Sequence, residues 1–398
     1  MGSSGTENTN GAYRESVPEP LRSEQRLHDP FEWYEEMRDS GSVRYDPDRG
    51  VYDVFSYQHV RESLGNDAQL ARPDLSTGQS ESPLSYIGKA LVWADGEDHK
   101  RGKGQMFPHF RPDRMAELRT EIREIATDQI HTAVNDGPRF DFVDEFASPV
   151  PLRVIMSLVG VPDCEHERVL NWLRKFRSQR HSEFSGFGSG TPSEMAAAVA
   201  YFEELVRDRT RDPQDDLASH LVAHTDLDDE TIGANCFNFI LAGQGTLRNL
   251  LANALYAFDE HGLLDDREDC DLNVVLEEVL RYRAPLQSRA RKTTEQVTVG
   301  DTDVPEGETV ILWIGSANRD QAEFSRPDEF VPDRDPDHLS FGRGPHTCIG
   351  APLARLEAPI ALEAFFECVD SVEVLDSYRP SSDPSELGFE RLPVEVTS

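Results

Sequence analysis

The sequence is poor in cysteine and has no long apolar run. Its 398 residues include 5 cysteines and no CxxC pair, which argues against a disulfide framework and zinc fingers and favours a reducing compartment. No stretch approaches the roughly 18 consecutive apolar residues that a membrane-spanning helix needs. Residues 1–20 lack the apolar segment of a secretory signal. We therefore expect a cytoplasmic protein that does not enter a membrane.

The chain is also poor in basic residues, because 40 Lys and Arg stand against 74 Asp and Glu, for a formal charge of −34. Nucleic acid and anionic lipid are excluded as expected partners, since both require clustered cations. The acidic residues are spread over the whole chain, so they repel one another in dilute buffer and are screened in molar salt. This composition predicts a protein from a salt-loving organism, and an ordinary acidic protein is the alternative.

The chain predicts a mainly α fold with small β-sheets. Residues 1–25 are expected to be a disordered polar leader, and 26–398 one domain without internal repeats. Residues 43–56 predict a β-hairpin, and 57–285 are mostly helical, with a Gly- and Ser-rich loop at 184–192. Strand patterns return at 289–313, an irregular stretch covers 319–347, and a helix follows Gly350. An irregular stretch of that length is usually functional.

The longest predicted helix covers residues 228–261, about 50 Å, with Asp228 as its N-cap and Gly262 at its end. Its centre reads Ala242, Gly243, Gln244, Gly245 and Thr246. Each interior glycine costs about 1 kcal/mol relative to alanine, so a ligand or a neighbouring helix is expected to approach the backbone here. The Thr246 hydroxyl can return to a carbonyl one turn back or serve a ligand.

A glycine-rich loop at 341–350 surrounds one cysteine, Cys348. A helix that begins directly after it would direct backbone N–H groups at the sulfur and favour the thiolate. Three interpretations are open at this point. Cys348 is a thiolate metal ligand, a nucleophile with His346 as its base, or a buried and inert side chain. The nucleophile is the weakest of the three, because no third group to orient His346 is evident.

A second motif pairs Glu278 with Arg281, three residues apart on one helix face. Such a pair is commonly an exposed bridge of about 0.3–0.5 kcal/mol. The apolar flanks predict burial instead, which requires a further partner, for which we name Arg334.

Together these motifs resemble the cytochrome P-450 superfamily, in its single-domain type known from bacteria and archaea. The resemblance extends from about residue 25 to the end of the chain. Its haem loop, FxxGxHxCxG, is matched by Phe341, Gly344, His346, Cys348 and Gly350. Its ExxR, PxxFxPxR and AGxxT motifs are matched in order by Glu278 and Arg281, by Pro327, Phe330, Pro332 and Arg334, and by Ala242, Gly243 and Thr246.

The resemblance implies a long central helix over haem b, with Cys348 as the proximal iron ligand. It implies propionate contacts from His99, Lys103, Arg291 and His346, with Ala242, Gly243, Phe341 and Gly350 also at the cofactor. It further implies insertion of one oxygen atom from O2 into a small, largely apolar substrate. Ferredoxin and ferredoxin reductase would supply the electrons to a monomer, since the chain has no room for a fused reductase.

The sequence departs from the family at Gly245, where an acid usually precedes the threonine. Gln244 cannot simply replace that acid, because adjacent helix positions point about 100° apart. A peroxide-driven peroxygenase, or a non-catalytic haem sensor, are therefore the alternative functions. The substrate contacts implied by the resemblance are Ile87, Leu91, Leu286 and Arg289.

Overall fold

The computed structural model describes residues 17–73, 86–135, 137–178, 192–265, 267 and 270–397. The predicted loop at 184–192 lies outside these residues apart from its last position, which begins a helix. The longer helices are α3 (Phe31–Ser40), α4 (Tyr57–Gly65), α6 (Gly96–Met106), α8 (Arg119–Asn135), α9 (Pro149–Val159), α10 (His166–Ser178), α11 (Pro192–Arg211), α12 (Leu217–His224), α13 (Asp229–Glu260), α14 (Leu272–Tyr282) and α16 (Ala351–Glu367).

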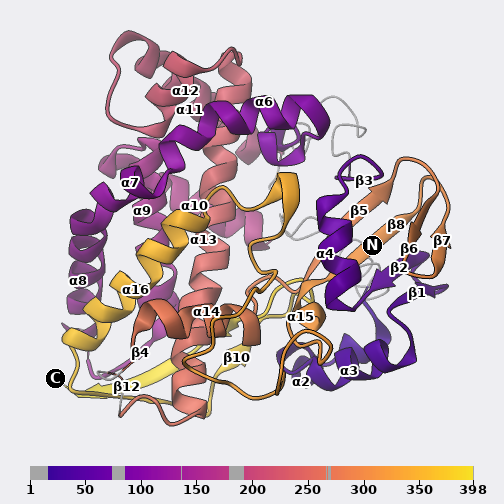
Figure 1. Cartoon of the computed structure of the whole chain (residues 1–398). Helices are drawn as coiled ribbons and strands as arrows, with labels where there is room; N and C mark the ends of the chain where they lie inside the picture. The colour runs from indigo at the N-terminus through magenta and orange to yellow at the C-terminus, as the bar shows by residue number, and fades with distance from the viewer. Residues whose placement is uncertain are drawn as a thin grey trace, which may run out of the picture.

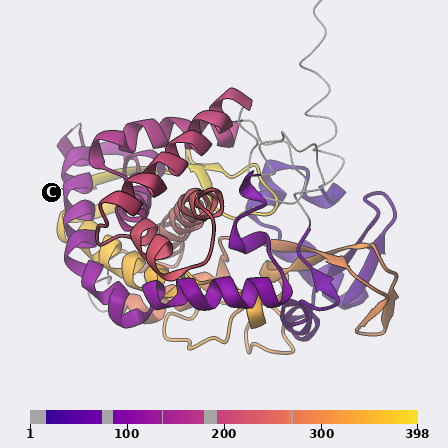
Figure 2. The same cartoon turned by 90° about the horizontal axis from the view of Figure 1, so that it is seen from above.

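Helix α13 is the centre of the helical part, as Figures 1 and 2 show. The Asp228 carboxylate accepts a hydrogen bond from the Thr231 amide at 2.8 Å and caps the helix. Gly262, which directly follows the turn at its end, has φ +67°, a conformation that favours glycine. Most of the α13 residues are buried in one large hydrophobic core. The predicted helix at 228–261 is confirmed.

The largest sheet has five strands in the order β1-β2-β8-β5-β3. Its β1 and β2 form the predicted hairpin, with Val43 opposite Val54, while β2 and β8 are parallel. The other strands form small antiparallel sheets: β10 with β11, β4 with β12 and β9, and β6 with β7. The strand bounds are β1 (Val43–Asp46), β2 (Val51–Val54), β3 (Leu70–Ala71), β4 (Arg139–Asp141), β5 (Ser288–Thr293), β6 (Val297–Val299), β7 (Thr302–Val304), β8 (Thr309–Trp313), β9 (Ser371–Val374), β10 (Arg379–Pro380), β11 (Phe389–Arg391) and β12 (Pro393–Thr397).

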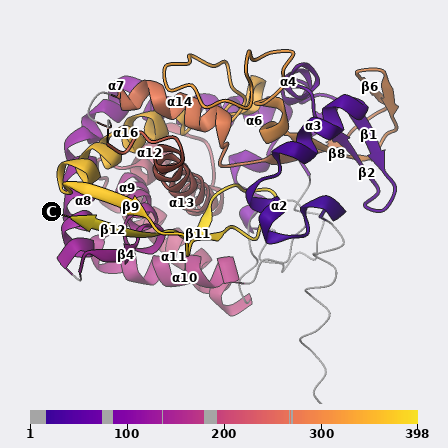
Figure 3. The same ribbon diagram turned by 90° about the horizontal axis from the view of Figure 1, so that it is seen from below.

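The helices and the five-stranded sheet occupy different sides of the molecule. Figure 1 shows most helices on one side and the five-stranded sheet on the other, and Figure 3 shows β9 and β12 beside the helices near the C-terminus. The mainly α fold with small sheets is confirmed. No helix in the described ranges combines the length and the apolar character needed to cross a lipid bilayer.

The start of the domain needs a correction, because residues 17–25 were expected to be disordered. Val17 and Leu21 are 5% and 1% exposed and pack with the sheet-side core. A short helix, α2 (Glu24–His28), follows, and the Ser23 hydroxyl accepts a hydrogen bond from the Arg26 amide to cap it. Apolar burial thus fixes this segment although its composition is polar.

Helix α6 is continuous although it contains two interior glycines, Gly102 and Gly104, which have low helix propensity. A Cβ at Gly102 would lie 2.7 Å from Leu91 Cδ1, so glycine lets the Leu91 side chain pack directly against the helix. Packing against the segment at 91–93 outweighs the low helix propensity, and it places His99 and Lys103 at the cavity described below.

Candidate active site

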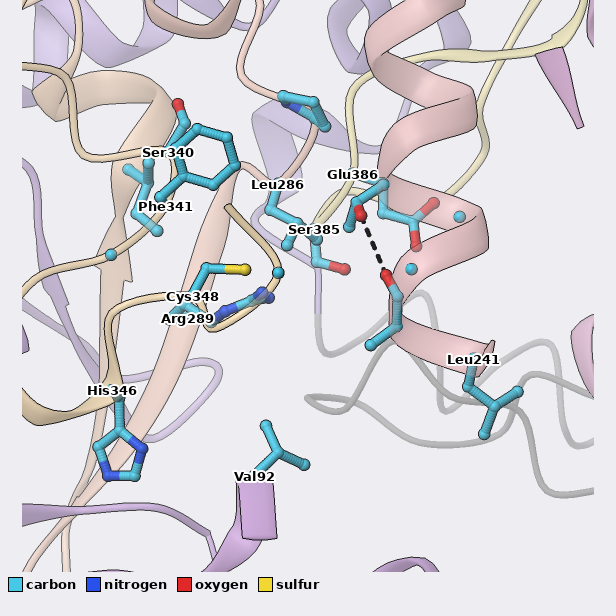
Figure 4. Close-up of a pocket in the computed structure, with 18 of the residues that line it drawn as sticks. Val92, Leu241, Leu286, Arg289, Ser340, Phe341, His346, Cys348, Ser385 and Glu386 are labelled. Carbon is cyan, nitrogen blue, oxygen red and sulfur yellow. Dashed lines mark hydrogen bonds between the residues drawn. The ribbon is translucent and has the colours of Figure 1, made fainter. Parts of the chain in front are cut away.

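A cavity of about 390 Å³ separates the Cys348 loop from α13. Figure 4 shows the Cys348 sulfur pointing into it, with Leu286 and Ser385 on one side and Val92 on the other. Most of the surface of its walls is apolar, and the charged and polar side chains that α6 and β5 contribute are His99, Lys103, Arg289 and Arg291. Of the predicted substrate contacts, Leu91, Leu286 and Arg289 line the cavity.

The loop that carries Cys348 is folded back on itself. The Cys348 amide donates to the Phe341 carbonyl at 2.8 Å, which closes the loop. Gly342 and Gly344 have φ +72° and +71°, where a side chain would be strained. A Cβ at Gly344 would lie 2.8 Å from the Gly65 Cα at the end of α4, so the loop is pressed against that helix. The sulfur is therefore held by backbone geometry.

The groups around the Cys348 sulfur have opposite effects on the pKa of its thiol. Burial raises the pKa of the Cys348 thiol, while the amides of Gly350 and Ala351 at the start of α16 and the Arg289 guanidinium lower it. The predicted helix start is present, but its N–H groups do not outweigh burial. A cation at the sulfur is what would stabilise the thiolate here.

Three arginines gather at one edge of the cavity. Arg289 and Arg291 are two residues apart on β5 and so share a face, and Arg72 directly follows β3, which pairs with β5. Burial, followed by mutual repulsion, lowers the pKa of Arg72 and lowers that of Arg291 to about 10. Among the described residues, no carboxylate lies within 4.0 Å of these three guanidinium groups. The cluster thus has no ion-pair partner in this part of the chain, and Asp95 acts on Arg72 and Arg291 only at longer range.

Two histidines and a lysine complete this edge. His99 and His346 stack with ring centroids 4.0 Å apart, and the His346 Nε2 lies 2.7 Å from the Asp95 carboxylate. His99 Nδ1 is buried and has no hydrogen-bond partner in the described part of the chain. Burial, then His346 and Lys103, lower the pKa of His99 to about 4, so it is neutral at pH 7. Lys103 Nζ donates to the Pro345 and Thr347 carbonyls at 2.6 and 2.7 Å.

The opposite wall is the centre of α13, where Ala242, Gly243, Gln244, Gly245 and Thr246 all line the cavity. Thr246 Oγ1 donates to the Ala242 carbonyl at 3.0 Å. A Cβ at Gly243 would touch Ile155 at 3.3 Å, whereas a Cβ at Gly245 would have no atom within 4 Å. The two glycines therefore differ: one permits packing between helices, and the other leaves open space beside the threonine.

The Glu278–Arg281 pair is fully buried on α14 and extends to Arg334. Arg281 donates Nε to Glu278 Oε2 at 2.7 Å and Nη2 to Glu278 Oε1 at 2.8 Å. Its remaining N–H groups reach carbonyls of the irregular stretch, at Asn318, Pro327 and Glu329. Arg334 Nε donates to Glu278 Oε1 at 3.1 Å. The irregular stretch thus supplies acceptors that a regular strand or helix would have used internally.

One predicted substrate contact, Ile87, lies in the hydrophobic core and not at the cavity. Ile87 is 1% exposed and belongs to the hydrophobic core, and it is not among the residues that line the cavity. The chain turns after it, with the Ala90 amide bonded to the Ile87 carbonyl, so that Leu91 and Val92 reach the cavity in its place.

Two residues that line the cavity, Arg72 and Glu357, escaped the sequence-based reasoning, as did Asp95, which binds two lining residues. Asp95 joins two segments, since its carboxylate binds the Arg72 amide at 2.7 Å as well as His346. Glu357 is 1% exposed, and burial raises its pKa to about 8. The one sequence signal for Glu357 is its position as an acid among apolar residues in the last long helix. Nothing local marks the other two.

These features define a haem-thiolate site. The site combines a cysteine in a rigid loop, a cavity edge with cations that lack ion-pair partners among the described residues, and an opposing helix with open space at Gly245. The comparisons agree with this class. The model of the family described as "Cytochrome P450" matches residues 271–384. The chain is 32% identical over 392 residues to cytochrome P450 119 of Sulfolobus acidocaldarius, covering 92% of this chain and 99% of the relative. The chain belongs to the cytochrome P450 family and is a P450 monooxygenase.

Solved structures show the same fold. CYP109E1 from Bacillus megaterium in complex with testosterone has a TM-score of 0.81 and 29% identity, over 92% of this chain and 99% of that one. P450BioI in complex with an acyl carrier protein ligated to hexadec-9Z-enoic acid has a TM-score of 0.85 and 28% identity, over 94% and 100%.

The residues present fit the haem-thiolate group that the family carries. A porphyrin with two propionates needs cations and donors at one edge, and here Arg72, Arg291 and the unpartnered His99 Nδ1 provide them. A thiolate ligand needs an unobstructed sulfur, and Cys348 opens onto the cavity. The predicted cofactor residues Ala242, Gly243, Phe341, His346 and Gly350 all line the same space.

Proposed function

We propose that the protein uses haem b, bound through Cys348, to insert one oxygen atom from O2 into a small, largely apolar organic substrate. The observation that carries this proposal is the Cys348 sulfur opening onto a cavity that Thr246 lines on the opposite wall. The bound group would supply oxygen activation, with the thiolate donating electron density to favour O–O cleavage. His99, Lys103, Arg291 and His346 would hold its propionates, together with Arg72.

The protein's own part in the reaction is to exclude bulk water and to deliver protons. The Thr246 hydroxyl donates to the Ala242 carbonyl, so its oxygen remains free to accept a hydrogen bond from water. The open space at Gly245 admits such a water beside Thr246. Gln244 is 7% exposed and also lines the cavity. These three residues would order the water through which protons reach the reacting oxygen.

The relatives support an apolar substrate that carries a polar group. One is seen with testosterone and another with a fatty-acyl carrier protein. The largely apolar cavity of this chain suits the same general class. Leu91 and Leu286 would pack against the substrate.

We propose a ferredoxin with its reductase as the electron source. By sequence, Arg101, Lys103 and Arg343 are the cations that would attract an acidic partner to the Cys348 face. Arg101 pairs with Asp98 at 3.2 Å and Arg343 with Asp337 at 3.0 Å, while Lys103 binds carbonyls. The cationic attraction is therefore weaker than the sequence indicates, and docking would rely more on shape than on steering.

A peroxygenase is the second candidate, favoured by Gly245 in the place of the usual acid. The missing acid weakens proton delivery when O2 is the oxidant, whereas hydrogen peroxide brings its own protons. Product formed with hydrogen peroxide, and none formed with O2 and an electron donor, would replace the first proposal by this one.

The test of haem-thiolate binding is the carbon monoxide difference spectrum of the reduced protein. Wild type should give the thiolate-type Soret band, and Cys348→Ser should lose it. Cys164→Ser is the matched control, because Cys164 is exposed and lies outside the cavity residues. An unchanged spectrum in Cys348→Ser would disprove the proposed ligand.

We further propose a cytoplasmic monomer from a salt-rich cell, supported by the charge of −34. Screening of that charge should raise the midpoint of thermal unfolding between dilute buffer and molar KCl. Equal midpoints in the two buffers would remove the support for a salt-adapted protein.

A further inference from the structure

Three polar side chains meet next to the cysteine loop, outside the cavity. They are Glu277 on α14, His338 in the irregular stretch and Arg355 on α16, and none of them is among the residues that line the cavity. Arg355 donates Nε and Nη2 to the two carboxylate oxygens of Glu277 at 2.7 and 2.8 Å. The His338 Nε2 lies 3.0 Å from Glu277 Oε2. One carboxylate thus joins three segments of the chain.

This group contacts the cysteine loop at Phe341. The Arg355 guanidinium carbon lies over the Phe341 ring, 4.5 Å from its centroid, and the His338 ring centroid lies 5.8 Å from the same point. A guanidinium at that distance is attracted to the face of the ring. The Phe341 carbonyl in turn accepts the hydrogen bond of the Cys348 amide. Phe341 therefore connects Arg355 to the backbone of the cysteine.

Both members of the ion pair are charged at pH 7, and Arg355 interacts with the charge of the sulfur. Burial raises the pKa of Glu277, but hydrogen bonds from Arg355 and His338 lower it to about 2. Hydrogen bonds to Glu277 raise the pKa of Arg355, burial lowers it, and the negative charges of Glu277 and of a Cys348 thiolate raise it further. Since the interaction of two charges is mutual, the Arg355 cation also acts on the Cys348 thiolate.

The Arg355 cation differs from the other cations near the sulfur. Arg289 and Lys103 also act on the Cys348 charge, but both line the cavity, where the carboxylates of a bound cofactor would compensate them. Arg355 lies outside the cavity, so its charge would still act on the sulfur in the loaded protein. Its side chain is 49% exposed and that of Glu277 is 22% exposed. Such a pair contributes little to folding, so stability does not explain it.

A fixed cation beside a thiolate ligand affects how readily the site is reduced. When one electron is taken up from the electron donor, the site gains one negative charge, and no bond forms or breaks. A nearby cation stabilises the more negative state and draws electron density away from the sulfur. Reduction is therefore easier with the cation in place than without it.

We propose that Arg355 is a positioning residue which, held by Glu277 and stacked on Phe341, weakens electron donation from Cys348 and so raises the reduction potential of the loaded protein. This inference rests on the proposed function, because it requires Cys348 as the haem ligand. It adds a control of electron uptake by residues outside the cavity.

The test is the midpoint potential of the haem-loaded protein, measured by dithionite titration at the lowest KCl concentration at which wild type stays folded. Arg355→Leu should lower the ratio of reduced to oxidised protein at a fixed potential at least threefold, which is about 28 mV for one electron. Arg355→Lys should keep more than half of the difference, because the charge remains although the planar fork is lost. An unchanged potential in Arg355→Leu, or an equal fall in Arg355→Lys, would overturn the proposal.

Glu277→Gln separates the effect of charge from a structural disturbance. Removing the negative member of the pair should raise the potential, whereas Arg355→Leu lowers it. The carbon monoxide stretching frequency of the reduced complex should rise in Glu277→Gln and fall in Arg355→Leu, because it falls when the sulfur donates more electron density. Shifts of the same sign in the two variants would show that the loop has only been loosened, and would overturn the proposal.

The matched control is Arg123→Leu. Arg123 is 40% exposed and pairs at 2.7 Å with Glu363 and Glu367, which lie on α16 two to three turns beyond Arg355. This variant should leave the potential unchanged, and a fall equal to that of Arg355→Leu would assign the effect to overall charge and overturn the proposal. The thiolate-type band of the carbon monoxide difference spectrum tests Cys348 separately. Its loss in wild type would end the proposed function, whereas its presence with an unaltered potential in Arg355→Leu would end this inference alone.

Discussion

Two groups of buried arginines in this molecule are built in opposite ways. Arg281 on α14 has every N–H group bonded, to Glu278 and to three backbone carbonyls. Arg72, Arg289 and Arg291 at the cavity lack a carboxylate partner among the described residues and repel one another. The Arg281 charge is balanced by groups of the protein itself, whereas the charges of the three cavity arginines need a ligand to balance them.

The difference shows which charges hold the fold and which belong to the site. A buried charge without a partner is costly, so a folded protein keeps it only where something else supplies the compensation. The propionates of the proposed cofactor would compensate the cavity arginines. Substituting arginines of either group tests this difference between structural and site charges.

The largest effect is expected for Arg281→Leu. Its removal leaves the Glu278 carboxylate fully buried with only Arg334 as a charged partner, which should lower the free energy of unfolding by about 3–5 kcal/mol. Denaturant unfolding measures this. The control is Arg355→Leu, whose partner Glu277 and whose own side chain are partly exposed, so a change of about 0–1 kcal/mol is expected. Similar losses in the two variants would remove the contrast.

Glu357→Gln should change how stability depends on pH. Burial raises the pKa of Glu357 from 4.5 to about 8, so the folded state holds a proton that the unfolded state releases. Wild type should therefore lose up to about 1.4 kcal/mol per pH unit, relative to the variant, as the pH rises from about 5 to about 8. Unfolding at several pH values measures the slope. The control is Glu363→Gln on the same helix, where Glu363 pairs with Arg123 at 2.7 Å.

Arg291→Leu should separate haem binding from stability. Removing one of three mutually repelling cations should leave the ligand-free protein as stable or more stable, while haem affinity falls at least tenfold, about 1.4 kcal/mol. The rate of haem transfer to apomyoglobin and thermal unfolding measure the two effects. Lys292→Leu, on the exposed side of the same strand, should change neither. A destabilised apoprotein with normal haem affinity would place Arg291 among the structural charges.

The smallest effect concerns the two glycines of α13. Gly245→Ala should raise the free energy of unfolding by about 1 kcal/mol, because the new methyl enters open space and helix propensity improves. Gly243→Ala should gain less or lose stability, since its methyl meets Ile155 at 3.3 Å. Thermal unfolding of both variants checks the order. A reversed order would mean that the space beside Thr246 is filled.

The sequence was a good guide wherever a local pattern decides the structure. The α13 bounds, the hairpin at 43–56 and the Glu278–Arg281 pair all depend on residues close in sequence, and the structure agrees with them. The cavity edge could not be predicted in the same way. Arg72 reaches Arg291 through strand pairing, and Asp95 reaches His346 across more than half of the chain. Segment 17–25 is ordered by tertiary burial, which its polar composition does not show.

The contact between Gly344 and Gly65 has a consequence for how this chain can change. Gly344 cannot gain a methyl group without moving the loop, because its Cβ would lie 2.8 Å from the Gly65 Cα, and the sulfur moves with that loop. A Cβ at Gly65, by contrast, would have no atom within 4 Å. The end of α4 thus limits how far the cysteine loop can move. Gly344→Ala should therefore alter the chromophore of the loaded protein, whereas Gly65→Ala should leave it unchanged, although the two glycines lie at the same contact.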